Sequence, residues 1–174
     1  DKMAFLDGAR FVEVHFRGTI SDNPALMLAA VTFIAMKEYG VAAEVIMPYG
    51  AGLRALGWWY AQLLGESLGK KFDTHGNIIY NGRIPVACVG TTDMHSLTQE
   101  HQQGKKNKIV QFISVRNLSD KADFFCDNGH AGGMVDLGML LKAAARSNQE
   151  ALAQEERMSC AIEIEKLTEF HIGM

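Results

Sequence analysis

The sequence predicts an α/β fold, a three-layer αβα sandwich around a mainly parallel sheet, formed by a single domain over residues 1–174. Short apolar runs of strand length alternate along the chain with longer runs of helical pattern, which is the order of βαβ units. The strand candidates are apolar at nearly every position, as in strands covered on both faces. The composition, 48% hydrophobic and 21% charged, suits one globular domain with a substantial core.

The first forty residues are predicted to be helical. Residues 2–17 carry apolar residues in a loose helical pattern. Residues 21–24, Ser-Asp-Asn-Pro, are typical of a helix cap followed by proline at the first helical position. The helix over 25–39 should then end at Gly40. Because this helix is apolar around most of its circumference, we expect it to be well buried.

The remaining elements follow from apolar runs and turn residues. Turn residues on both sides of residues 78–80 predict a loop or small hairpin over residues 71–82, and residues 116–129 form a polar stretch. Strands are expected at 42–47, 84–90, 108–115 and 158–164, and helices at 51–64, from 92 or 93 to 103, at 135–157, and from 167.

Charge and cysteine content exclude several classes of protein. The net charge is −3 and the pI about 6.1, without a basic stripe for nucleic acid. No apolar run reaches transmembrane length, and the first residues do not resemble a signal peptide. Cys88, Cys126 and Cys160 are far apart in sequence, which indicates buried free thiols in a reducing cytoplasm.

Glu66 is the first candidate for chemistry. It lies between Gly65 and Gly69, where the amphipathic helix ends, and glycine lets the backbone leave a helix. The negative end of the helix dipole disfavours charge on a carboxylate there, which suits a general base near neutral pH. The competing interpretation is an ordinary solvated glutamate at a helix end.

His95 is the second candidate. The strand over 84–90 leads directly into Thr91–Ser96, so His95 should lie in the first turn of the next helix, beyond the carboxyl end of a strand. The positive end of that helix favours a neutral imidazole, which can both donate and accept a proton. The histidines have neither HxH nor HExxH spacing, and the chain has neither a GxGxxG fingerprint nor a Walker loop, so no metal or cofactor is expected.

These residues also form a pattern. Gln62, Glu66, Ser67, Gly69 and Lys70, followed by Thr91, Thr92, Asp93, His95 and Ser96, resemble in order and spacing the motifs of glucose-6-phosphate isomerase. Asp22–Ala25 before a helix and the Trp58-Trp59 helix add to the resemblance. The chain is similar to the second, larger sugar-isomerase (SIS) domain of that family. The likeness covers most of the chain to about residue 115 and is weaker through 116–155.

The resemblance implies a cytoplasmic enzyme of glycolysis and gluconeogenesis. It would interconvert glucose 6-phosphate and fructose 6-phosphate by proton transfer between carbons 2 and 1, through a cis-enediol(ate). Glu66 would move the proton, and Gln62 would contact the sugar or order a water. His95 would assist ring opening, contributed across the interface of a homodimer.

Other family motifs are missing from this sequence. These are the arginine motif expected before it, a Ser/Thr-rich phosphate loop, and the closing motif with a catalytic lysine. The chain is therefore expected to be a fragment of a longer enzyme and inactive alone. Two alternatives are a non-catalytic phosphosugar-binding SIS module, disfavoured because residues 47–53 lack a hydroxyl cluster, and a dimerisation domain. Specificity for other sugars, such as mannose 6-phosphate, and the role of residues 116–130 are left open.

Overall fold

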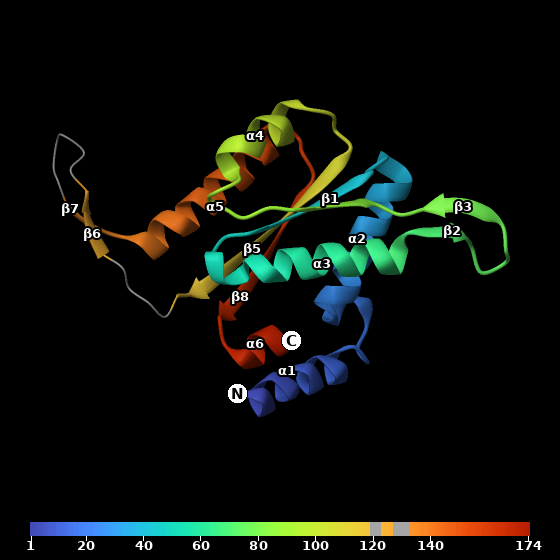
Figure 1. Ribbon diagram of the computed structural model, residues 1–174, viewed down its shortest axis with the longest axis horizontal. Coiled ribbons are helices and arrows are strands. Elements are labelled where there is room, and N and C mark those ends of the chain that lie inside the picture. Colours follow the sequence, from blue (N-terminus) through green and yellow to red (C-terminus); the bar gives the residue numbers. More distant parts are fainter. Residues whose placement is uncertain (119–122, 127–132) are drawn as a thin grey trace. The chain divides into compact units, whose positions relative to one another are not determined.

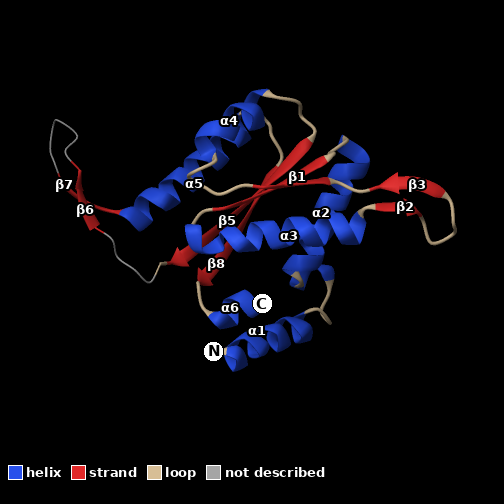
Figure 2. Cartoon of the chain, in the orientation of Figure 1, coloured by secondary structure: helices blue, strands red, loops and turns tan. Residues whose placement is uncertain are grey.

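The computed structural model describes residues 1–118, 123–126 and 133–174, with side chains described outside 119–135 (Figure 1). Figure 2 distinguishes the helices from the strands. The elements are, in chain order, α1 (Lys2–His15), the 3-10 helix η1 (Ile20–Asp22), α2 (Pro24–Tyr39), β1 (Ala43–Pro48), the 3-10 helix η2 (Ala51–Leu53), α3 (Arg54–Leu68), β2 (Lys70–Phe72), β3 (Ile78–Asn81), β4 (Ile84–Ala87), α4 (Met94–Gln103), β5 (Lys108–Asn117), β6 (Asp123–Cys126), β7 (Gly133–Asp136), α5 (Leu137–Gln154), β8 (Ser159–Lys166) and α6 (Glu169–Gly173).

The chain divides into two compact units. One contains Asp1–Gly40, the end of β5 and Glu163–Met174, and the other contains Val41–Ser114, α5 and the start of β8. In the first unit α1 packs against α6, and a Cβ on Gly8 would collide with the backbone at Phe170. The single domain over residues 1–174 stays a prediction.

A four-stranded sheet in the order β4-β1-β5-β8 organises the larger unit. β1 pairs in parallel with both β4 and β5, so that Val45 lies opposite Val86 on one side and Val110 on the other. This confirms the mainly parallel sheet. The strand expected over 84–90 is shorter, since β4 ends at Ala87, but Gly90 forms an isolated parallel bridge with Tyr49.

Helices cover both faces of this sheet, which confirms the α/β sandwich. Val45 and Met47 of β1 belong to a buried cluster that includes Ala145 and Leu152 of α5. Glu44 points to the opposite face, where α3 packs on β1 and β4. The alternation of side chains along an extended strand produces this division.

The caps of α2 are confirmed, but its expected burial is wrong. The Asn23 side chain accepts a hydrogen bond from the Leu26 backbone N–H at 3.0 Å, Pro24 opens the helix, and Gly40 closes it at φ +67°. Among its residues only Thr32 and Ala35 are buried. Its exposed large apolar side chains are Leu26, Met27, Val31, Phe33, Ile34 and Tyr39.

The expected hairpin over 71–82 is confirmed as the antiparallel pair β2–β3. Part of the polar stretch over 116–129 forms a strand that the sequence pattern did not indicate, because β6 pairs antiparallel with β7, with Asp123 opposite Asp136. Since β7 includes Val135, α5 begins two residues later than expected, with Asp136 as its cap. Most of the glycine-rich stretch 129–133 lies outside the described residues.

Candidate functional site

Glu66 lies in the last turn of α3, as expected. Gln62 precedes it by one turn, and its amide Nε2 donates a hydrogen bond to Glu66 Oε1 at 3.3 Å. Both side chains are exposed. Beyond the helix, Lys70 Nζ donates to the Glu66 backbone carbonyl at 3.0 Å, a contact that suits the negative end of a helix. A carboxylate and an amide therefore lie together at an accessible helix end.

Glycine ends this helix because no larger residue fits. The Gly69 N–H donates to the Gly65 carbonyl at 3.1 Å, and a Cβ on Gly69 would lie 2.7 Å from that oxygen. The chain then turns into β2, where Lys70 pairs with Asn81. Because the chain leaves the helix at Gly69, Glu66 lies within one turn of the helix end.

The position of Glu66 also depends on which face α3 turns to the sheet. Gly57 and Leu64 are buried, and Tyr60 between them reaches the sheet with its hydroxyl. These residues are three and four apart, so they form one helix face. Gln62 and Glu66 lie on the exposed part of the helix.

His95 is the second residue of α4 and is exposed. The turn before it is held by Asp93, whose carboxylate accepts a hydrogen bond from the Val89 N–H at 2.7 Å. The Met94 N–H donates to the Thr91 carbonyl at 3.1 Å and starts the helix. The expected placement of His95 in the first turn is therefore confirmed.

Glu66 and His95 lie at opposite ends of the sheet within one chain. Near its start α3 passes the end of the strands, where a Cβ on Gly57 would lie 3.6 Å from Pro48. Near its end it passes the start of β4, where a Cβ on Gly65 would lie 4.0 Å from Pro85. His95 follows the other end of β4, at the start of α4. The two residues are therefore not brought together within one chain.

Sequence reasoning missed a buried polar cluster beneath α3. Glu44 is fully buried in β1, and its carboxylate accepts hydrogen bonds from Arg83, Tyr60 and Gln111. The signal was a single glutamate inside an otherwise apolar strand. Burial raises the pKa of Tyr60, and the hydrogen bond to Glu44 raises it further.

The expected burial of the free thiols is confirmed for Cys88, whereas Cys160 is half-buried, and the Cys126 side chain lies outside the described part. Within the described residues no cluster of three His, Cys, Asp or Glu side chains could hold a metal ion. Helices in that same part of the chain are too short or too polar to cross a membrane.

Comparison with known proteins identifies the family. The family model for phosphoglucose isomerase matches residues 1–167. The glucose-6-phosphate isomerase of Carboxydothermus hydrogenoformans is 31% identical over 97% of this chain, and that of Thermosynechococcus vestitus is 32% identical over 97%. The chain belongs to the phosphoglucose isomerase family.

Solved structures agree on the fold. A hypothetical protein of Thermus thermophilus superposes with a TM-score of 0.87 at 25% identity, over 99% of this chain and 41% of that one. A glucose-6-phosphate isomerase of Chlamydia trachomatis gives 0.80 at 22% identity, over 98% of this chain and 35% of that one. The chain spans 37% and 31% of the length of the two curated relatives named above.

Proposed function

We propose that this chain is a sugar-isomerase domain of an enzyme that interconverts glucose 6-phosphate and fructose 6-phosphate in the cytoplasm, in glycolysis and gluconeogenesis. The observation that carries the proposal is the pairing of Gln62 with Glu66 on an exposed helix end, in a chain of the phosphoglucose isomerase family. Because the chain spans about a third of its relatives, we expect it to have negligible activity alone.

In the proposed reaction Glu66 removes the proton from carbon 2 of the open-chain sugar and returns it to carbon 1, through a cis-enediol(ate). Gln62 orients the Glu66 carboxylate through its amide and contacts the sugar or a water. A positioned general base contributes about 10²–10⁴-fold to such a rate.

His95 is proposed to assist ring opening in the active site of a partner subunit of a homodimer. The separation of Glu66 and His95 at opposite ends of one sheet supports this arrangement, because a single site of one chain does not hold both. Exposed indole rings of Trp58 and Trp59, 63% and 56% accessible, are available for such a contact. They also favour the second candidate, a dimerisation domain without chemistry.

The test replaces the matching segment of the Carboxydothermus hydrogenoformans enzyme with this chain, which yields what we call the exchanged enzyme. Fructose 6-phosphate formation is measured for Glu66→Gln and for Glu155→Gln, a control that neutralises an exposed glutamate at the end of α5. Loss of at least 10²-fold with the first change alone supports the proposed base. Full activity of both variants rejects it.

Mixed dimers test whether His95 acts across the interface. Glu66→Gln and His95→Ala subunits are each expected to be inactive, whereas a mixed dimer has one site with both natural residues. Random mixing should therefore restore roughly a quarter of the original activity if the dimer is symmetric. No restoration between two inactive variants would place His95 in the same site as Glu66 of its own chain. Activity retained by both variants would favour the dimerisation domain.

A further inference from the structure

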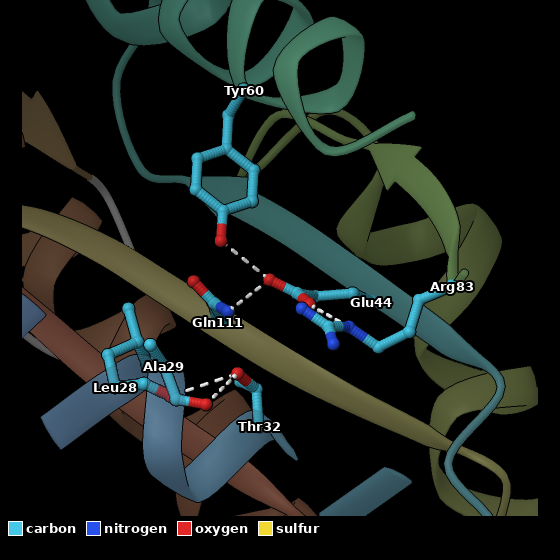
Figure 3. Close-up of polar contacts among 7 residues, drawn as sticks. All are labelled: Leu28, Ala29, Thr32, Glu44, Tyr60, Arg83 and Gln111. Carbon is cyan, nitrogen blue, oxygen red and sulfur yellow. Dashed lines mark hydrogen bonds and ion pairs between the residues drawn. The ribbon is translucent and has the colours of Figure 1, made fainter. Parts of the chain in front are cut away.

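The Glu44 carboxylate joins three other segments of the larger unit (Figure 3). Arg83 Nε donates to Oε2 at 2.6 Å, and Gln111 Nε2 of β5 donates to Oε1 at 2.6 Å. The third donor is the Tyr60 hydroxyl of α3, at 2.7 Å from Oε1. Glu44 is fully buried and the Arg83 side chain is only 8% exposed.

This arrangement gives the carboxylate a fixed orientation. A buried carboxylate with a guanidinium partner and two neutral donors has its charge compensated and most of its lone pairs occupied. Rotating it would break at least one hydrogen bond in a site that water does not reach. The oxygen facing α3 is therefore a fixed acceptor.

Apolar packing alone would fix the orientation of α3 on the sheet less specifically than a hydrogen bond does. Its contact face contains Gly57, which has no side chain, and Leu64, whose contacts are non-directional. A hydrogen bond, in contrast, depends steeply on distance and angle. The Tyr60 bond therefore restricts both rotation of α3 about its axis and sliding along the sheet.

We propose that Glu44 and Tyr60 are positioning residues that set the orientation of α3 and thereby the place of the Glu66 carboxylate. Glu66 follows Tyr60 by six residues on the same helix, so that a change in rotation at Tyr60 moves it directly. The inference rests on the proposed role of Glu66.

The test is Tyr60→Phe, which removes one hydroxyl and keeps the ring. Its matched control is Tyr39→Phe, which removes the hydroxyl of an exposed tyrosine at the end of α2. In the chain alone, amide hydrogen exchange across residues 54–68 should be at least tenfold faster in Tyr60→Phe than in the control. Exchange equal to that of the control would overturn the proposal.

In the exchanged enzyme, assayed where both variants are fully folded, Tyr60→Phe should lower kcat at least tenfold with KM changed less than twofold, because misplacement by about 1 Å can cost up to 10²-fold. A purely structural role would leave kcat unchanged, and that result would also overturn the proposal. Glu66→Gln distinguishes the proposed base from the proposed positioning role. If Glu66→Gln is inactive while Tyr60→Phe has normal activity, Glu66 remains the proposed base and the positioning role of Tyr60 is rejected. If Glu66→Gln is fully active, both proposals are rejected.

Discussion

Gly90 lies directly against the ring of Tyr49, so closely that a Cβ on residue 90 would be 2.6 Å from ring atoms Cε2 and Cζ. The Gly90 N–H also donates to the Pro48 carbonyl at 2.9 Å. The Tyr49 hydroxyl in turn accepts a hydrogen bond from Asn148 of α5 at 3.1 Å. The loop that leads to His95 is thus held at the end of the sheet by backbone contact that only glycine allows.

Gly90→Ala should therefore destabilise the chain by about 1–3 kcal/mol, because overpacking against a buried ring forces either residue to shift. The matched control is Gly65→Ala, a helical position where a Cβ would make only an ordinary van der Waals contact with Pro85 at 4.0 Å, so alanine should be neutral or stabilising by up to about 1 kcal/mol. Urea unfolding of the two variants measures both effects. Equal stability of the two would contradict this account of Gly90.

Arg83→Met should cost about 3–5 kcal/mol, since it leaves the charge of Glu44 buried without its cationic partner. Arg146→Met is the control, because its partner Glu150 is exposed and such a pair contributes at most about 0.5 kcal/mol. Adding Glu44→Gln to Arg83→Met removes the remaining charge and should recover part of the loss in urea unfolding. If Arg83→Met lost less free energy of unfolding than Arg146→Met, the buried pair of Arg83 and Glu44 would not contribute to stability.

His101 should make stability fall in mild acid. Burial lowers its pKa below the ordinary 6.5, with Glu100 opposing this effect and Lys108 adding to it. The unfolded chain therefore binds a proton more readily, so the contribution is complete above pH 6.5 and is lost as pH falls below it. Unfolding at pH 7.5 and 5.0 should show a smaller acid loss in His101→Gln than in the wild type. His75→Gln, at an exposed position, should leave that loss unchanged.

Cys88 should make stability fall in base. Burial, followed by the charge of Asp93, raises its pKa from 9.0 to about 11. The folded state holds the proton more tightly, so the contribution is complete below pH 9 and is lost as pH rises toward 11. Between pH 8 and 10.5, Cys88→Ala should lose less stability than the wild type, by on the order of 1–2 kcal/mol. An identical loss in both proteins would contradict the raised pKa.

Local sequence signals were sufficient for the helix ends. Asn23 and Pro24 start α2 and Gly40 ends it, and Gly69 follows α3, because capping depends on hydrogen bonds within three or four residues. For the same reason the pairing of Gln62 with Glu66, four residues apart, could be expected from their spacing.

Local sequence patterns did not predict burial or strand pairing, because these depend on segments that are distant in the sequence. The apolar pattern of α2 indicated burial, yet among its residues only Thr32 and Ala35 are buried, because burial depends on segments distant in the sequence and not on the pattern of the helix itself. The strand β6 was missed because it is short and its partner β7 lies further along the chain, so that no continuous apolar run predicts the pair.

The sequence by itself determined the class of fold, the order along the chain of the strands of the main sheet and of the long helices, and the helix positions of Glu66 and His95, since periodicity, caps and motifs are local properties of the chain. Only the tertiary structure decided that Glu66 and His95 face opposite ends of the sheet. It also brought Arg83 and Gln111, 39 and 67 residues from Glu44, to one carboxylate. Such contacts depend on how strands pair and how a helix rotates on the sheet, and packing of the whole unit sets both.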